Sequence, residues 1–285
     1  MDIIEYDSSD SFLQRAAPVL ARNEAFTGLI YGVADRIGRI SDPDEEVEPP
    51  FLASVEQNGD VLLIAVMTPP HRLILHARED TPDADALRAL VSHLRASSRS
   101  TPGVLGPRPL SESFADTWTR LSGQQIGQGL AMTVYELRKL HPHDGAPGVF
   151  RHATDADREL LQTWSDAFHL EVHGHPAVGQ EVRAVSRRLP NGNYRIWEDG
   201  GRPVSFAARS RPTPTGLAIN AVYTPAEFRG HGYATSCVAA LCDEILTSGR
   251  QFCTLFADVE NPTSNSIYQR LGFLALGEFV EFDFE

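Results

Sequence analysis

The 285-residue chain contains one lysine, Lys139, and no Gly-Lys-Ser or Gly-Lys-Thr sequence. A Walker phosphate-binding loop ends in such a sequence, so this class of nucleotide site is excluded. The sequence also lacks any apolar run of the roughly 18 residues that a membrane-spanning helix needs. Its first residues carry no basic region followed by an apolar stretch, so we expect no secretory signal.

Positive charge and cysteine are scarce as well. The formal net charge is −13, which argues against a nucleic-acid partner because nucleic-acid-binding domains carry a basic face. An acidic surface serves solubility, or it attracts a cationic ligand. Three closely spaced cysteines indicate reduced packing residues rather than a disulfide framework: Cys237, Cys242 and Cys253. We expect a cytoplasmic protein that contacts neither nucleic acid nor membrane, and no sequence feature indicates an oligomer.

The length is about twice that of a usual domain, and the two halves of the sequence are alike. Each half begins with a strand and a Ser/Thr/Asp cluster that caps a helix. A hairpin follows, with its turn at Asn58-Gly59 in the first half and at Asp199-Gly200 in the second. A third strand, a helix, a strand, a helix and a closing strand complete each half. We predict two tandem domains, 1–140 and 148–285, joined by a linker rich in turn-forming residues.

Residues 222–234 predict a strand, a glycine-bearing loop and a helix start in immediate succession. A helix N-terminus leaves its first N–H donors unpaired and carries partial positive charge, so it suits an anion such as a pyrophosphate. Gly230 and Gly232 have no side chain to keep the anion from the backbone, and Arg229 adds positive charge. A dinucleotide-binding fingerprint would need a third glycine, but Ala234 and Thr235 stand there.

The order Arg229-x-x-Gly232-x-Ala234 resembles the acetyl-CoA loop of the GNAT N-acetyltransferase superfamily. Residues 261–273 resemble the closing segment of that superfamily, with an Asn after a strand, a short helix carrying a Tyr, and then Gly-Phe. The resemblance covers about residues 148–285. It implies an α/β fold of two tandem GNAT-like domains, each with a central mixed, mostly antiparallel sheet flanked by helices.

The first half differs from the second at the phosphate loop. Where the second half has its glycines, residues 78–83 contain none and carry three carboxylates, which would repel a pyrophosphate. The first half also lacks the Asn and Tyr of the closing segment. We interpret it as a degenerate copy that no longer binds cofactor.

By resemblance, the second half uses acetyl-CoA as co-substrate, needs no metal, and transfers an acetyl group by direct attack of a small-molecule amine. Two parallel strands, 217–224 and 254–258, would splay so that the pantetheine arm pairs with exposed backbone. Tyr268 would protonate the departing thiolate and Asn261 would hydrogen-bond the arm. The remaining contacts would come from Val222, Tyr223 and Thr224 for the arm, and from Arg229, Gly230, His231, Gly232, Tyr233, Ala234 and Thr235 for the pyrophosphate.

Each assignment has a structural alternative. Gly230 and Gly232 could form a plain turn, Asn261 could cap the helix that starts at Pro262, and Tyr268 could pack on Phe273. Cys253 could suggest a covalent acyl-enzyme, but it lies early on an expected buried strand, so packing is favoured.

The general base is less clear from the sequence, because residues 217–221 contain no acid. Asp258 is our candidate, with Glu260, Glu227 or a chain of waters as alternatives, and Asp258 could equally cap a turn. His169, His173 and His175 with Glu171 lack a zinc-protease spacing and indicate a polar acceptor loop.

Two classes of function therefore remain open from the sequence. The first is an N-acetyltransferase, or an enzyme that transfers a different acyl group. The second is a non-enzymatic regulator that binds acyl-CoA.

Overall fold

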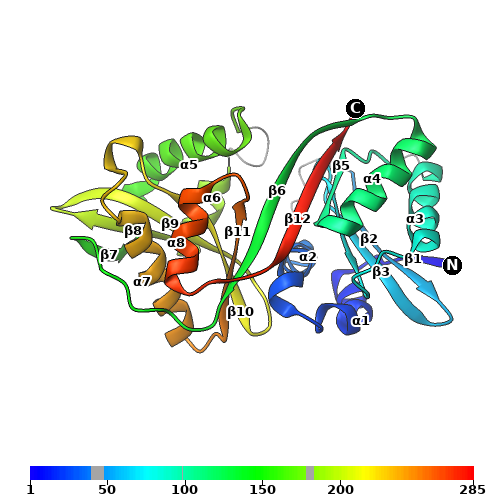
Figure 1. Ribbon diagram of the computed structural model, residues 1–285, viewed down its shortest axis with the longest axis horizontal. Helices are drawn as coiled ribbons and strands as arrows, with labels where there is room; N and C mark the ends of the chain where they lie inside the picture. The colour runs from blue at the N-terminus through cyan, green and yellow to red at the C-terminus, as the bar shows by residue number, and fades with distance from the viewer. Residues whose placement is uncertain (40–47, 98, 178–182) are drawn as a thin grey trace. The chain divides into compact units, whose positions relative to one another are not determined.

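The computed structural model describes residues 1–39, 48–97, 99–177 and 183–285. The chain forms two compact units (Figure 1). The first unit comprises Met1–Val134, Phe256–Asn261 and Ala275–Glu285, and the second comprises Tyr135–Leu255 and Pro262–Leu274. The predicted α/β class is confirmed in both. The acidic run at 41–50 lies largely outside the described residues.

The strands of the first unit form a mixed sheet in which β4 and β5 are parallel and the other recorded pairs are antiparallel. The predicted hairpin turn is confirmed, because Asn58 and Gly59 both have positive φ, 53° and 84°. In sheet order the strands are β1 (Asp2–Glu5), β2 (Phe51–Gln57), β3 (Asp60–Met67), β4 (Leu73–Ala77), β5 (Gly103–Pro107), β12 (Leu274–Phe284) and β6 (Ile126–Leu137).

Helices cover both faces of this sheet. Because side chains alternate along a strand, β2 and β3 supply two cores. Leu52 and Ile64 pack with α1 (Ser9–Leu20) and α2 (Glu24–Ile37), whereas Phe51 and Leu63 pack with α3 and α4. The latter two helices span Ala84–Ala96 and Arg108–Ser122. Helix α2 is an element that the sequence pattern did not predict.

The last strand differs from expectation. Each half was expected to close with its own strand, but β12 lies antiparallel beside β5, with Phe282 opposite Val104. Strands β12 and β6 run side by side in Figure 1 and are neighbours in sheet order. Phe282 and Phe284 of β12 pack in the core of the first unit, and Asp283 pairs with Arg72 at 2.7 Å. Cutting the chain at the linker would therefore remove a strand from the first unit. The linear division into 1–140 and 148–285 stays a prediction.

The second unit has a mixed sheet in which β10 and β11 are parallel and β7 to β10 are antiparallel. Helices α5 (Arg158–His173) and α6 (Ala184–Arg188) pack on one face. Helix α7 (Tyr233–Thr247) packs on the other face, with α8 (Pro262–Leu271) beside it. In sheet order the strands are β11 (Phe252–Asp258), β10 (Gly216–Tyr223), β9 (Arg202–Pro212), β8 (Tyr194–Asp199) and β7 (Val149–His152).

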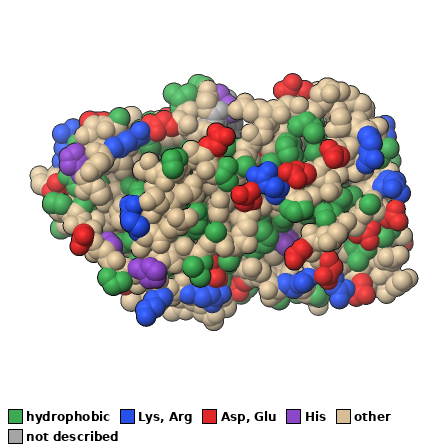
Figure 2. All heavy atoms as spheres, viewed as in Figure 1, with side chains coloured by type: hydrophobic (Ala, Val, Ile, Leu, Met, Phe, Trp, Pro, Cys, Tyr) green, Lys and Arg blue, Asp and Glu red, His purple; other side chains and the backbone are tan. Residues whose placement is uncertain are grey.

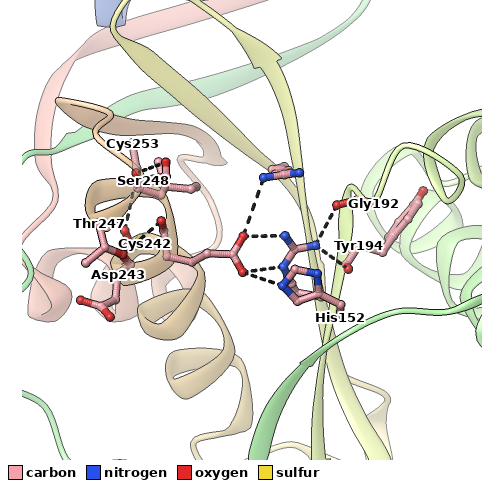
Figure 3. Close-up of polar contacts among 12 residues, drawn as sticks. His152, Gly192, Tyr194, Cys242, Asp243, Thr247, Ser248 and Cys253 are labelled. Atoms are coloured by element: carbon pink, nitrogen blue, oxygen red, sulfur yellow. Dashed lines mark hydrogen bonds and ion pairs between the residues drawn. The ribbon is translucent and has the colours of Figure 1, made fainter.

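A buried ion pair anchors α7 to this sheet (Figure 3). The Arg195 side chain of β8 is 1% exposed, and its Nε donates to Glu244 Oε2 of α7 at 2.8 Å. Its Nη1 donates to the carbonyl oxygens of Gly192 and Tyr194. His152 also lies 3.2 Å from the Glu244 carboxylate. Burial alone would raise the pKa of Glu244, but the hydrogen bond and charge of Arg195 outweigh it and lower that pKa.

We expect Glu244→Gln to destabilise the fold by about 1.5–3 kcal/mol at neutral pH, because it leaves a buried guanidinium without its anion. The folded-state pKa is lowered, so the carboxylate stabilises the fold above the ordinary glutamate pKa of about 4.3. This contribution is lost as the pH falls through the folded-state pKa. Urea denaturation across that range checks this, with Asp243→Asn on the exposed neighbouring position as control. A stability difference that does not shrink in acid would contradict the assignment.

Within the described ranges, no helix has the length and apolar character needed to cross a membrane. On the face drawn in Figure 2, acidic and basic side chains are interspersed over the surface.

Candidate functional site

The glycine loop of the second unit leads directly into α7. It follows the short 3₁₀ helix η2 (Ala226–Phe228), and Gly230 and Gly232 adopt left-handed φ of 82° and 79°. Gly232 is the N-cap of the 15-residue helix α7, and no side chain caps that end. A Cβ built on Gly230 would meet nothing within 4 Å, and one on Gly232 would meet only Ala146, at 3.7 Å. The first N–H groups of α7 therefore open onto an uncrowded surface that suits an anion.

In the first unit, the corresponding helix is α3, and a carboxylate already occupies its N-terminus. The carboxylate of Asp83, the N-cap of α3, accepts from the N–H groups of Asp85 at 3.0 Å and Ala86 at 2.9 Å. Strands β4 and β5 are also tightly apposed, since a Cβ on Gly106 would lie 2.6 Å from the carbonyl oxygen of Leu75. Of these two helices, α3 has two of its first donors capped by a carboxylate, whereas no side chain caps the start of α7.

Strand β10 leaves part of one edge open and is distorted along the other. Its parallel pairing with β11 covers Gly216 to Ala218 and ends at the pair Ala218–Thr254. Against β9, Asn220 lies opposite Ala208 and Tyr223 opposite Phe206, so β10 carries one extra residue there. Ala221 lies in this bulge with a φ of 54°. Such bulges bend a strand and redirect its edge. The sequence carried no signal for it, because left-handed alanine is uncommon.

The end of β10 is held by side chains. Ser205 Oγ donates to the carbonyl oxygen of Tyr223 at 3.0 Å, and Thr224 Oγ1 donates to Ser205 Oγ at 2.9 Å. Arg229 Nε donates to the carbonyl oxygen of Thr224 at 2.8 Å. Two of the three residues expected to hold the pantetheine arm thus use their carbonyls internally. Backbone pairing with a ligand would consequently use Val222 and the rest of the open edge of β10.

The Arg229 side chain is directed at α5. Its Nη2 donates to both carboxylate oxygens of Glu171, at 2.9 and 2.7 Å. The Tyr223 hydroxyl donates to Glu171 Oε1 at 3.3 Å. Burial and the neighbouring Glu171 raise the pKa of Tyr223. Sequence reasoning considered Glu171 only together with the histidines, and it did not anticipate this ion pair with the loop.

The first residue of α7 is fixed by the β8–β9 hairpin. Tyr233 donates its hydroxyl proton to Asp199 Oδ2 at 2.6 Å, and this hydrogen bond raises the pKa of Tyr233. The His231 ring stacks on Tyr233 with centroids 5.5 Å apart. The loop therefore has a defined conformation at its entry into α7.

Tyr268 lies on α8 and is 7% exposed. Its ring centroid is 5.6 Å from that of Phe273 and 6.1 Å from that of Tyr135, so the packing considered from the sequence is present. Burial raises the pKa of Tyr268. A tyrosine is protonated at neutral pH even at its ordinary pKa of about 10, so the raised pKa makes this phenol a weaker acid. A protonated phenol is the form that a proton donor needs.

Asp258 and Asn261 belong to the first unit, whereas the loop and Tyr268 belong to the second. Asp258 Oδ1 accepts from the N–H of Glu260 at 2.8 Å, and the carbonyl oxygen of Asp258 accepts from the N–H of Asn261 at 3.1 Å. The turn-capping role that was weighed for Asp258 is therefore observed. Its role as a base stays a prediction.

The three cysteines are unpaired and buried. Burial raises the pKa of Cys237 to about 12, and Cys253 is fully buried, which supports packing over nucleophilic catalysis. In the part of the chain that the structure describes, no group of three or more His, Cys, Asp or Glu side chains could hold a metal ion.

The sequence and the fold were compared with those of known proteins. Residues 202–280 match the FR47-like protein family. A GNAT-family acetyltransferase from Colwellia psychrerythraea superposes with a TM-score of 0.61 at 11% identity, and the match covers 100% of both chains. The chain has the GNAT fold. The resemblance predicted from the glycine loop and the closing segment is confirmed at this level.

Two further structures share the GNAT fold over nearly the whole length. A GCN5-related N-acetyltransferase from Sphaerobacter thermophilus has a TM-score of 0.60 at 15% identity, covering 98% of this chain and 94% of its own. A tandem GNAT protein from the clavulanic acid biosynthesis pathway has a TM-score of 0.58 at 14% identity, covering 99% and 97%. No curated protein matches the sequence. At sequence identities this low, structural similarity establishes the fold and not the function.

Proposed function

We propose that this GNAT protein is an acetyl-CoA-dependent N-acetyltransferase that acts on a small-molecule amine in the cytoplasm. The observation that carries the proposal is the uncapped N-terminus of α7 behind two left-handed glycines with open space around them. Such a terminus binds phosphate groups through backbone N–H donors and the helix dipole. When bound, acetyl-CoA supplies the acetyl group as an activated thioester.

The residues of this chain have distinct proposed roles. The backbone from Gly230 to Thr235 binds the pyrophosphate, and the open edge of β10 around Val222 orients the pantetheine arm. Asn261 hydrogen-bonds the arm. Tyr268 holds the proton that the departing thiolate needs. Asp258 is retained as candidate base for the acceptor amine.

A non-enzymatic acyl-CoA-binding regulator is the second candidate, and transfer of a different acyl group is a variant of the first. Two observations favour the regulator: β10 carries no acid, and the Asp258 carboxylate caps a turn. Release of free thiol from acetyl-CoA in the presence of a panel of primary amines separates the two. Binding of acetyl-CoA without amine-dependent thiol release across the panel would favour the regulator.

We expect one acetyl-CoA to bind per chain, with its pyrophosphate at the start of α7. Asp83 caps two of the donors at the start of α3, whereas no side chain caps those of α7. Isothermal titration calorimetry of the full chain measures the stoichiometry. Because β12 completes the first unit, the whole chain is the appropriate sample. Two equivalent sites would contradict the interpretation of the first half as a degenerate copy.

A further inference from the structure

The carboxylate of Glu171 joins helix α5 to both the glycine loop and the end of β10. It accepts two hydrogen bonds from Arg229 and one from the hydroxyl of Tyr223. The side chains of Glu171 and Arg229 are 49% and 48% exposed, so both groups are open to a ligand. The sequence of β10 contains no carboxylate, but its last residue, Tyr223, hydrogen-bonds to Glu171 of α5.

The ion pair lies beside the proposed phosphate site. Arg229 stands three residues before Gly232, the N-cap of α7, yet its Nη2 group is turned to Glu171. Guanidinium binds phosphate and carboxylate with the same planar, charge-assisted geometry. A half-exposed ion pair contributes little net stability, so a pyrophosphate at the loop can compete for Arg229.

Exchange of partners would change the local charge. While Arg229 pairs with Glu171, the two charges cancel and a cationic amine gains little from approaching the carboxylate. Once an anion neutralises Arg229, the carboxylate of Glu171 is left uncompensated and attracts a cation. In this structure the Tyr223 hydroxyl also donates to Glu171. This second hydrogen bond does not involve Arg229 and would hold the carboxylate at the end of β10.

We propose that the Glu171–Arg229 pair is an exchangeable latch that couples co-substrate binding to acceptor binding. The phosphates of acetyl-CoA take Arg229 from Glu171, and the released carboxylate binds the ammonium group of the acceptor. This inference rests on the proposed function and adds to it a binding order, with the co-substrate first. Glu171 is thus a binding residue for the acceptor. Because coupling between two ligands is reciprocal, the acceptor also tightens binding of the co-substrate.

Calorimetry with acetyl-CoA tests the first half of the latch without knowledge of the acceptor. Glu171→Gln removes the competitor for Arg229, so we expect affinity to rise by about fivefold, at the lower end of typical coupling. In an Arg229→Gln background, Glu171→Gln should leave the affinity for acetyl-CoA unchanged. Glu159→Gln makes the identical change at an exposed position three turns earlier on α5 and should leave affinity unaltered.

Failure of the latch and failure of the proposed function give different results in this experiment. If Glu171 merely holds the loop in shape, Glu171→Gln weakens acetyl-CoA binding, and a weaker or unchanged affinity overturns the latch. A folded wild-type chain that does not bind acetyl-CoA at all overturns the proposed function instead.

The second half of the latch is tested with n-butylamine, present as its ammonium ion at neutral pH. It is titrated into the full chain with and without saturating CoA. We expect CoA to raise the affinity for this probe by about fivefold in the wild type and not in Glu171→Gln. Equal affinity of both proteins for the probe in the presence of CoA would overturn the acceptor role of Glu171.

Discussion

Gly232→Glu is expected to abolish acetyl-CoA binding in a protein that remains folded. The substitution places a carboxylate at the N-cap of α7, where the phosphates are proposed to sit. Loss of two charge-assisted hydrogen bonds, each of about 1.5–3 kcal/mol, weakens binding by roughly 10²-fold or more. Calorimetry with acetyl-CoA measures the loss, and circular dichroism verifies the fold.

The chain offers a matched control at the other end of the same helix. Gly249 also has a left-handed φ, of 94°, and a Cβ there would meet nothing within 4 Å. Gly249→Glu therefore carries a similar backbone strain of about 1–2 kcal/mol and the same charge. It should bind acetyl-CoA like the wild type. Normal binding by a folded Gly232→Glu protein would show that the phosphates do not bind at this loop.

Tyr268→Phe is expected to lower kcat by about 10²–10⁴-fold while changing acetyl-CoA affinity little. The hydroxyl is proposed to give its proton to the thiolate as charge develops on sulfur, and such an interaction appears in kcat rather than in KM. The ring retains its packing on Phe273 and Tyr135, so stability should be preserved. The measurement needs an acceptor identified by the thiol-release panel and conditions in which chemistry limits the rate.

Tyr135→Phe is the matched control for this experiment. It removes a second hydroxyl from the same aromatic cluster, one that donates to Asn265 Oδ1 at 2.9 Å. We expect only a modest change in kcat. Equal losses for Tyr135→Phe and Tyr268→Phe, or no loss for Tyr268→Phe, would assign Tyr268 to packing alone.

Local sequence patterns were sufficient for hairpin turns and helix starts. The turn at Asn58-Gly59 and the start of α7 at Tyr233 follow the prediction, and the parallel pairing of β10 with β11 agrees with what the resemblance implied. Hairpin turns and helix starts depend on residues within a few positions of one another, so a short stretch of sequence encodes them. The fold class followed because these local elements recur in one order in both halves.

The sequence by itself thus determined the α/β class, most of the strands and helices of each half and a glycine loop before a helix. Only the tertiary structure decided which distant groups meet. Asp283 pairs with Arg72 across 211 positions, and Glu171 pairs with Arg229 across 58. The bulge at Ala221 likewise has no local signal. Such contacts depend on which surfaces are buried together when the chain packs, and a residue's immediate neighbours in sequence carry little information about that.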